Sequence, residues 1–200
     1  MNGQPFINQG LAQAINGGTL TFNNSWSNSG TLVQSGGTLY LNGNMTTAGL
    51  VTINRTNGTV YLTGVLNNTN ATLALNAASG SWVLSGGTVQ GGTIAASGGA
   101  GLLVNNNGNN ALVGVTVSGT LDVGNSYNNG MVNVTGGLVL SNATVLVGNP
   151  TNGWSGRLWF SGSQTLGGTG TVVFGSSGCN GLVVNNDGTT LTIGPGVTVR

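Results

Sequence analysis

Residues 36–64, GGTLYLNGNMTTAGLVTINRTNGTVYLTG, contain one short pattern twice. The heptapeptide GTLYLNG of residues 37–43 returns as GTVYLTG at residues 58–64. In both copies apolar side chains occupy every second position, which is typical of a β-strand with one buried side. A recurrence at this distance indicates a repeat protein in which each unit is one turn of a larger structure.

The same pattern recurs along the whole chain. A small residue is followed by apolar residues two and four positions later, and successive copies are 17 to 24 residues apart, with a mean of about 20. A second strand-like unit, such as Leu73 with Leu75, follows in most intervals. If equivalent positions stack, the first apolar residues of the copies form one core column, which consists of Leu20, Leu39, Val60, Trp82, Leu102, Leu121, Leu138, Leu158 and Leu182.

This periodicity predicts an all-β fold, namely a right-handed parallel β-helix (β-solenoid) of roughly nine coils with about 20 residues per coil. In an antiparallel sandwich, equivalent strand positions do not stack from one unit to the next, so the same residue class is not expected to recur at a fixed position of every repeat. The right hand follows from the strong bias of parallel crossover connections. We expect one domain over residues 1–200, with residues 1–17 as a partial first coil. We also expect it to be a piece of a longer repeat protein, because residues 197–200 stop in mid-pattern.

The composition is chemically plain. The 200 residues include 39 glycines, 38% hydrophobic residues and 2% charged residues, with a net charge of +1. This apolar content suffices for a core, whereas disordered chains combine high net charge with few apolar residues. A charge so small gives no attraction to nucleic acids or anionic lipids, and no apolar run is long enough to span a membrane. We expect no nucleic-acid partner and no membrane insertion by this segment.

The chain offers little for catalysis. It lacks His, Lys and Glu, and with them the usual general base, the commonest metal ligand and the Schiff-base amine. Asp122 and Asp187 are about three coils apart, which is too far for a carboxylate pair, and each is expected in an Asx-turn rather than in a weak Ca²⁺ site. We expect no enzyme, no catalytic residue, no cofactor and no metal site. The lone Cys179 is interpreted as buried rather than as an exposed thiol.

Two tyrosines occupy the position between the two core residues of neighbouring copies. Tyr40 and Tyr61 are therefore expected outside, one above the other. We favour a cross-strand aromatic pair that stabilises the sheet, and the alternative is a candidate glycan contact formed by exposed rings. Thr38 and Thr59 begin an outward hydroxyl column, but ice-binding solenoids present two threonine columns and here the second position holds tyrosine.

Asparagine is concentrated between the predicted strands, where the chain turns its corners. Two explanations carry equal weight: the amides form ladders from coil to coil, or asparagine is simply a good turn former. The runs lie at residues 67–70, 105–107, 109–110, 128–129 and 185–186.

Several repeat units resemble a known class of sequence. They include GGTL at residues 17–20, GGTI at residues 91–94, GTLDV at residues 119–123 and LTIGPG at residues 191–196. Such units resemble the β-helical regions of bacterial autotransporters and filamentous-haemagglutinin-like exoproteins, and the tandem repeats of giant bacterial surface proteins. The resemblance covers nearly the whole chain and implies a secreted or surface-exposed stalk or adhesin segment. It brings no catalytic residue with it.

These observations together predict a non-catalytic structural rod or stalk segment of a bacterial extracellular surface protein or adhesin. Uncapped ends would favour association with further copies of the chain, end to end, into fibres. The alternative function is a glycan-binding adhesive face around Tyr40 and Tyr61, with cell-surface or matrix glycans as partners. The expected location is the cell surface, with the signal and the anchor outside this segment, because residues 1–5 lack the basic start of a signal peptide.

Overall fold

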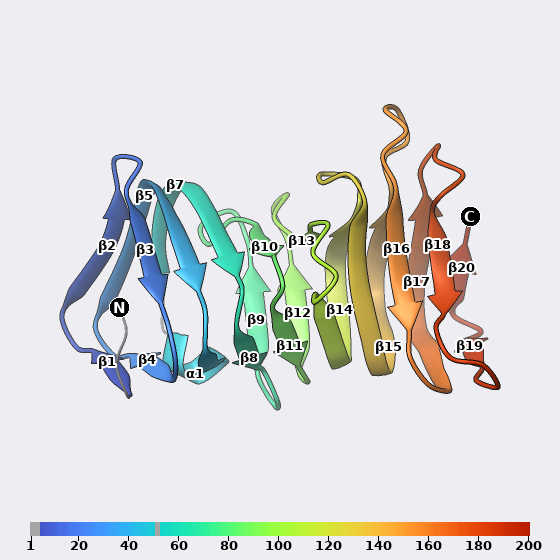
Figure 1. The fold of residues 1–200 in the computed structure, drawn as a ribbon, viewed down its shortest axis with the longest axis horizontal. Coiled ribbons are helices and arrows are strands. Elements are labelled where there is room, and N and C mark those ends of the chain that lie inside the picture. Colours follow the sequence, from blue (N-terminus) through green and yellow to red (C-terminus); the bar gives the residue numbers. More distant parts are fainter. Residues whose placement is uncertain (1–4, 51–52) are drawn as a thin grey trace.

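The computed structural model describes residues 5–50 and 53–200 and confirms the predicted parallel β-solenoid. The chain makes about eight turns of about 22 residues, close to the roughly nine coils expected. Successive turns lie side by side along one axis, and the first and last described strands lie at opposite ends of the stack (Figure 1). Residues 5–15 form the first two strands, whereas residues 1–4 of the expected partial first coil lie outside the described residues.

Three strands make a turn, and each belongs to one of three parallel faces. Face 1 carries the repeated heptapeptide, with the outward tyrosines on it. Its strands, in stacking order, are β3 (Thr19–Phe22), the ends of β5 (Thr31–Leu41) and β7 (Ile53–Leu62), β10 (Trp82–Leu84), β13 (Leu102–Val104), the ends of β14 (Ala111–Val123), β15 (Gly130–Val147) and β17 (Gln164–Phe174), and β20 (Val197–Val199).

The other two faces are stacked in the same way. Face 2 consists of β1 (Phe6–Asn8), β4 (Trp26–Asn28), β6 (Asn44–Thr46), β8 (Val65–Asn67), β11 (Thr88–Gln90), the beginnings of β14 and β15, β16 (Gly156–Phe160) and β18 (Gly181–Val184). Face 3 consists of β2 (Leu11–Ile15), the beginnings of β5 and β7, β9 (Thr72–Leu75), β12 (Thr93–Ala96), the middles of β14 and β15, the beginning of β17, and β19 (Leu191–Ile193).

Some strands bend through a corner without ending. In β14 the pairing register shifts beside Gly114 and Gly119, where φ is 59° and 84°. Glycine adopts this left-handed backbone conformation at little energetic cost. A Cβ on Gly119 would also collide with the carbonyl oxygen of Ala96 in the preceding turn. Glycine at this corner therefore lets one strand serve two faces.

A short helix interrupts the strands at one corner. The helix α1 (Thr47–Leu50) connects β6 on face 2 to β7 on face 3 and buries Leu50. The repeat pattern did not predict it. Within the part of the chain that the structure describes, no helix is long and apolar enough to cross a membrane.

The core fills the interior between the three faces. In the opening heptapeptides Leu39 pairs in register with Val60, and Leu41 pairs with Leu62. All four side chains are buried, because alternate residues of a strand point inward and each turn covers the one before it.

The predicted core column is correct up to Leu121 and wrong beyond it. Leu121 pairs with Val145 and not with Leu138. Leu138 belongs to face 3, where it pairs with Leu166, whereas Leu158 and Leu182 pair with each other on face 2. The turns are longer in this part of the chain, because the connections at residues 124–129 and 148–155 are long. Residues spaced by about 20 positions after Leu121 therefore belong to strands of other faces.

Candidate functional site: the open end and the tyrosine face

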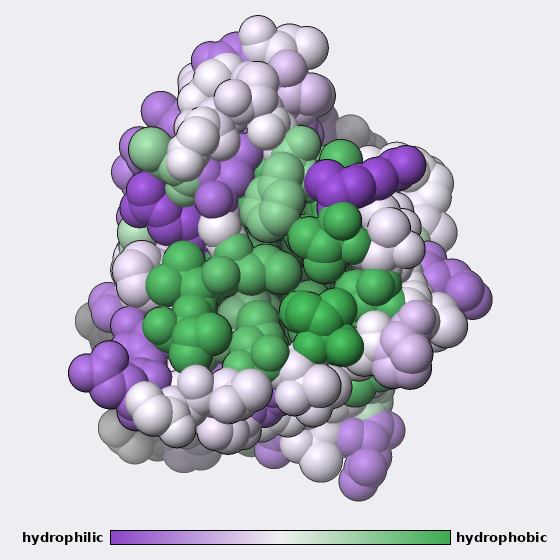
Figure 2. Space-filling model, turned by 90° about the vertical axis from the view of Figure 1, so that its right-hand side faces the viewer, coloured by the Kyte–Doolittle hydropathy of each residue, from purple (hydrophilic) through white to green (hydrophobic). Residues whose placement is uncertain are grey.

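The last turn of the solenoid leaves one end of the stack open. Its strands β18, β19 and β20 pair with β16 and β17 of the preceding turn. Within residues 5–50 and 53–200, their outer edges have no partner strand. Figure 2 looks onto this end and shows a hydrophobic centre surrounded by residues of intermediate to hydrophilic character.

The hydrophobic centre consists of core-type side chains. Val184, Ile193 and Val199 are 42%, 40% and 41% exposed. Their partners one turn earlier are Phe160, Leu166 and Val172, all of them fully buried. The last turn therefore covers its neighbour while its own outer side remains open. Covering each of the three side chains would contribute about 1 kcal/mol.

The opposite end has a different core. Phe22 has no exposed surface and stacks on Trp26, with ring centroids 4.5 Å apart. Phe6 also packs against this group, with its ring centroid 5.7 Å from that of Phe22. Ala12 and Ala14, the inward residues of β2, are small and buried. Aromatic rings therefore fill the core of the first turns, and the two ends of the solenoid are not equivalent.

The tyrosine pair lies on the outer side of face 1. Tyr40 and Tyr61 are register partners, and their rings stack with centroids 5.0 Å apart and planes inclined by 13°. Each ring thus covers one side of the other, and both side chains are half-buried. This arrangement is the one expected of a cross-strand aromatic pair in a parallel sheet.

A third tyrosine reaches this group from a distant loop. Tyr127 follows β14, and burial raises the pKa of its phenol, as do the neighbouring Tyr61 and the charge of Asp122. The loop is anchored by Asp122, which is 3% exposed. Its carboxylate accepts four hydrogen bonds, from the backbone and side chains of Asn125 and Ser126. No sequence pattern links Tyr127 to Tyr61, which belongs to a much earlier turn.

The other chemically notable residues lie apart from one another. Asp122 sits on face 1, whereas Asp187 is exposed in the connection after β18. Cys179 is exposed, so the interpretation of this residue as a buried side chain is wrong. It lies in a loop between faces, where Arg157 Nε donates to its carbonyl oxygen. In the described ranges, no three His, Cys, Asp or Glu side chains lie close enough to hold a metal ion.

The asparagines of the corners play both of the expected roles. Asn8 donates to the side chain of Asn28 at 2.6 Å, which is an amide ladder between two turns. Asn76 instead accepts hydrogen bonds from the backbone of Ala78 and Ser79 within its own turn. Asn110 is fully buried and donates to the carbonyl of Met131 in the next turn. Corner asparagines therefore close turns and also join them.

The fold and these surfaces define a class of protein: an all-β parallel β-solenoid built from stacked turns. No protein-family model, no curated protein and no solved structure matches the chain. The resemblance to autotransporter and haemagglutinin repeats therefore rests on the repeat units alone.

Proposed function

We propose that the chain is a non-catalytic structural rod segment of a bacterial extracellular surface protein or adhesin, and that it associates end to end with a second copy. Continuous parallel ladders and one apolar core make such a stack stiff. Because charged residues make up 2% of the chain, pH and salt have few groups on which to act. The resemblance of the repeat units to bacterial exoproteins supports the extracellular location.

The open end is the observation that carries this proposal. Val184, Ile193 and Val199 are core residues by register, and they lack a covering turn among the described residues. The strands that hold them also present an unpaired edge, which is a template for another strand. A further turn of the solenoid placed on this end, from a second copy or from a continuation of the same chain, would extend the ladders and bury the hydrophobic centre at the same time.

Sedimentation velocity and electron microscopy of the purified chain over a range of concentrations test the association. We expect the native chain to form assemblies whose fraction rises with concentration. Ile193→Glu places a charge in the hydrophobic centre and should leave monomers. Thr192→Glu is the matched control, because it adds the same charge to the same strand at an outward position and should assemble like the native chain.

Two results would contradict the association: a native chain that stays monomeric throughout, or an Ile193→Glu variant that assembles as the native chain does. The form of the assembly is informative as well. Filaments mean that the open end docks onto the aromatic end of the next copy, whereas discrete dimers mean that two open ends meet. The surface location is tested separately, by antibody labelling of intact and permeabilised source cells.

The second candidate function is a glycan-binding face. The observation in its favour is that Tyr127 adds a third tyrosine to the pair Tyr40 and Tyr61 on one side of the rod. A glycan array tests it directly: binding by the native chain that is lost in the double variant Tyr40→Ala and Tyr61→Ala supports an adhesive face. Absence of binding by the native chain rejects it.

A further inference from the structure

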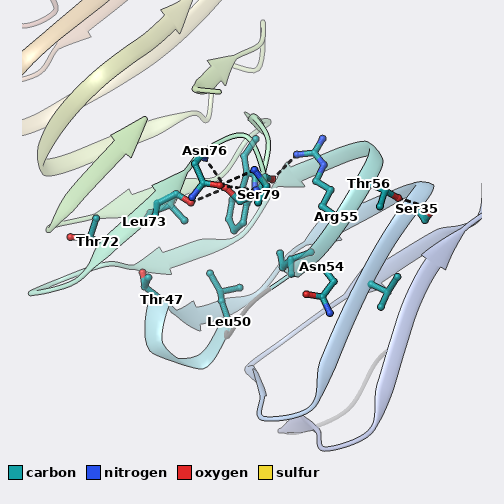
Figure 3. A pocket seen from close by; sticks show the side chains of 15 residues that line it. Ser35, Thr47, Leu50, Asn54, Arg55, Thr56, Thr72, Leu73, Asn76 and Ser79 are labelled. Carbon is teal, nitrogen blue, oxygen red and sulfur yellow. Dashed lines mark hydrogen bonds between the residues drawn. The ribbon is translucent and has the colours of Figure 1, made fainter. Parts of the chain in front are cut away.

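The stack of face 3 is interrupted at one step. The beginning of β7 pairs with β5, and β9 pairs with β12, but β7 and β9 form no ladder with each other within the described ranges. Figure 3 shows these two strands separated, with side chains of both lining the space between them. The space is a cavity of about 820 Å³.

Arg55 provides a physical reason for the interruption. It pairs in register with Gln34, which has no exposed surface, so Arg55 occupies an inward position of β7. A guanidinium stacked inside an apolar core would lose its hydration without compensation. Here the ladder opens, and the half-buried guanidinium donates to three carbonyl oxygens, namely those of Ser79 at 3.0 Å, Ser81 at 2.7 Å and Gly58 at 2.5 Å.

The positive charge of Arg55 has no acidic partner on these turns. The chain contains two acidic side chains, Asp122 and Asp187, and both lie on later turns. The three carbonyl contacts use both N–H groups of Nη1 and one of Nη2. The Nε–H and the second Nη2–H are left without an acceptor among the described residues, and burial lowers the pKa of the guanidinium. An anion in the cavity would satisfy both the charge and the free donors.

Apolar side chains line other parts of the cavity. Leu50, Ile53 and Leu73 supply apolar surface, together with Trp82, whose side chain is 4% exposed. The indole Nε1 of Trp82 is enclosed by the protein, so it does not face a ligand in the cavity. The cavity thus combines an apolar lining with one cationic N–H donor group.

We propose that this cavity binds a monocarboxylate with an apolar tail, of the kind represented by a medium-chain fatty acid. The carboxylate accepts hydrogen bonds from the free N–H groups of Arg55, and the tail packs against Ile53 and Leu73. The volume of about 820 Å³ lies within the range that small-molecule sites occupy. The site does not include the open end, so a test of ligand binding does not depend on whether the rods associate.

Isothermal titration calorimetry with dodecanoate, below its micelle concentration, tests the proposal. We expect saturable binding of about one carboxylate per chain, because Arg55 is the one cationic residue among the described residues that line the cavity. Arg55→Gln should weaken binding at least about tenfold, since it removes the charge-assisted contacts. Arg157→Gln removes the same charge outside the cavity and should bind like the native chain. Dodecan-1-ol should bind the native chain and Arg55→Gln equally, because it carries no charge.

A second variant blocks the cavity without touching Arg55. Ala74→Trp fills the space from an exposed position of β9, and Ser118→Trp places the same ring on face 3 outside the cavity. Ala74→Trp should lose dodecanoate binding while Ser118→Trp keeps it. This pair decides the question if circular dichroism shows that Arg55→Gln is unfolded. The proposal is overturned if the native chain shows no saturable binding, if a folded Arg55→Gln binds dodecanoate as the native chain does, or if Ala74→Trp does.

Discussion

The rings of Tyr40 and Tyr61 stack with their centroids 5.0 Å apart and their planes inclined by 13°. A stacked pair of this kind contributes about 0.5–1.5 kcal/mol beyond the area that it buries. We therefore expect a double-mutant cycle with Tyr40→Ala and Tyr61→Ala, measured by denaturant unfolding, to give a coupling free energy in that range. The register partners Thr38 and Thr59 serve as the control pair and should couple weakly. Additive tyrosine substitutions would show that the contact does not stabilise the sheet.

The carboxylate of Asp122 holds the loop that carries Tyr127. Asp122→Ala removes the acceptor of four hydrogen bonds and leaves the backbone N–H groups of Asn125 and Ser126 without it. We expect a loss of about 2–3 kcal/mol in the free energy of unfolding, and faster hydrogen exchange at those two amides. Asp187→Ala, at an exposed residue, should change stability by less than about 0.5 kcal/mol. Unchanged exchange in Asp122→Ala would contradict the anchoring role.

The raised pKa of Tyr127 predicts a loss of stability in alkali. Because its pKa in the folded chain lies above the unfolded value of about 10, folding favours the neutral phenol. This contribution is present below about pH 10 and is lost as the pH rises through the folded pKa. The melting temperature should change little between about pH 6 and 9, since the chain contains no histidine, and should fall above about pH 10. Tyr127→Phe should show a smaller alkaline fall, and an equal fall would assign the effect to other groups.

The inward column of face 1 predicts where truncation is costly. Leu41 has no exposed surface, so Leu41→Ala should lower the free energy of unfolding by about 2–5 kcal/mol, through lost burial and the cavity that remains. Val139→Ala shortens an apolar side chain that is 45% exposed and should cost less than about 0.5 kcal/mol. Urea unfolding followed by far-UV circular dichroism measures both. A small effect at Leu41 would contradict its inward orientation.

The repeat pattern predicted the fold best where the turns have a nearly constant length. From Leu20 to Leu121 the register partners follow one another at nearly even intervals, and the heptapeptides stack in the predicted register. Beyond Leu121 the steps along face 1 lengthen, first to Val145 and then further to Val172. Spacing alone then aligned strands from different faces, because every face of a solenoid repeats the same alternation of apolar residues.

The candidate sites were predicted unevenly, for a related reason. Tyr40 and Tyr61 lie in adjacent copies of one heptapeptide, so the repeat itself brings them together. Tyr127 reaches Tyr61 through a loop that belongs to no repeat unit, and no local signal predicts its path. Arg55 and Gln34 occupy the same place in neighbouring repeats, so the sequence does contain a pair of aligned polar residues. This pair becomes informative only when the position is known to point inward.

The sequence by itself determined the parallel β-solenoid, the inward and outward positions of the repeated heptapeptides, and the small number of charged residues. These properties follow from short-range periodicity, which a chain carries in its residue order. Only the tertiary structure decided that the two ends differ, that a loop brings Tyr127 to Tyr61, and that the ladder opens between β7 and β9. Those features depend on which side chains lack a covering neighbour and on how far each connection reaches, and both are properties of packing in space.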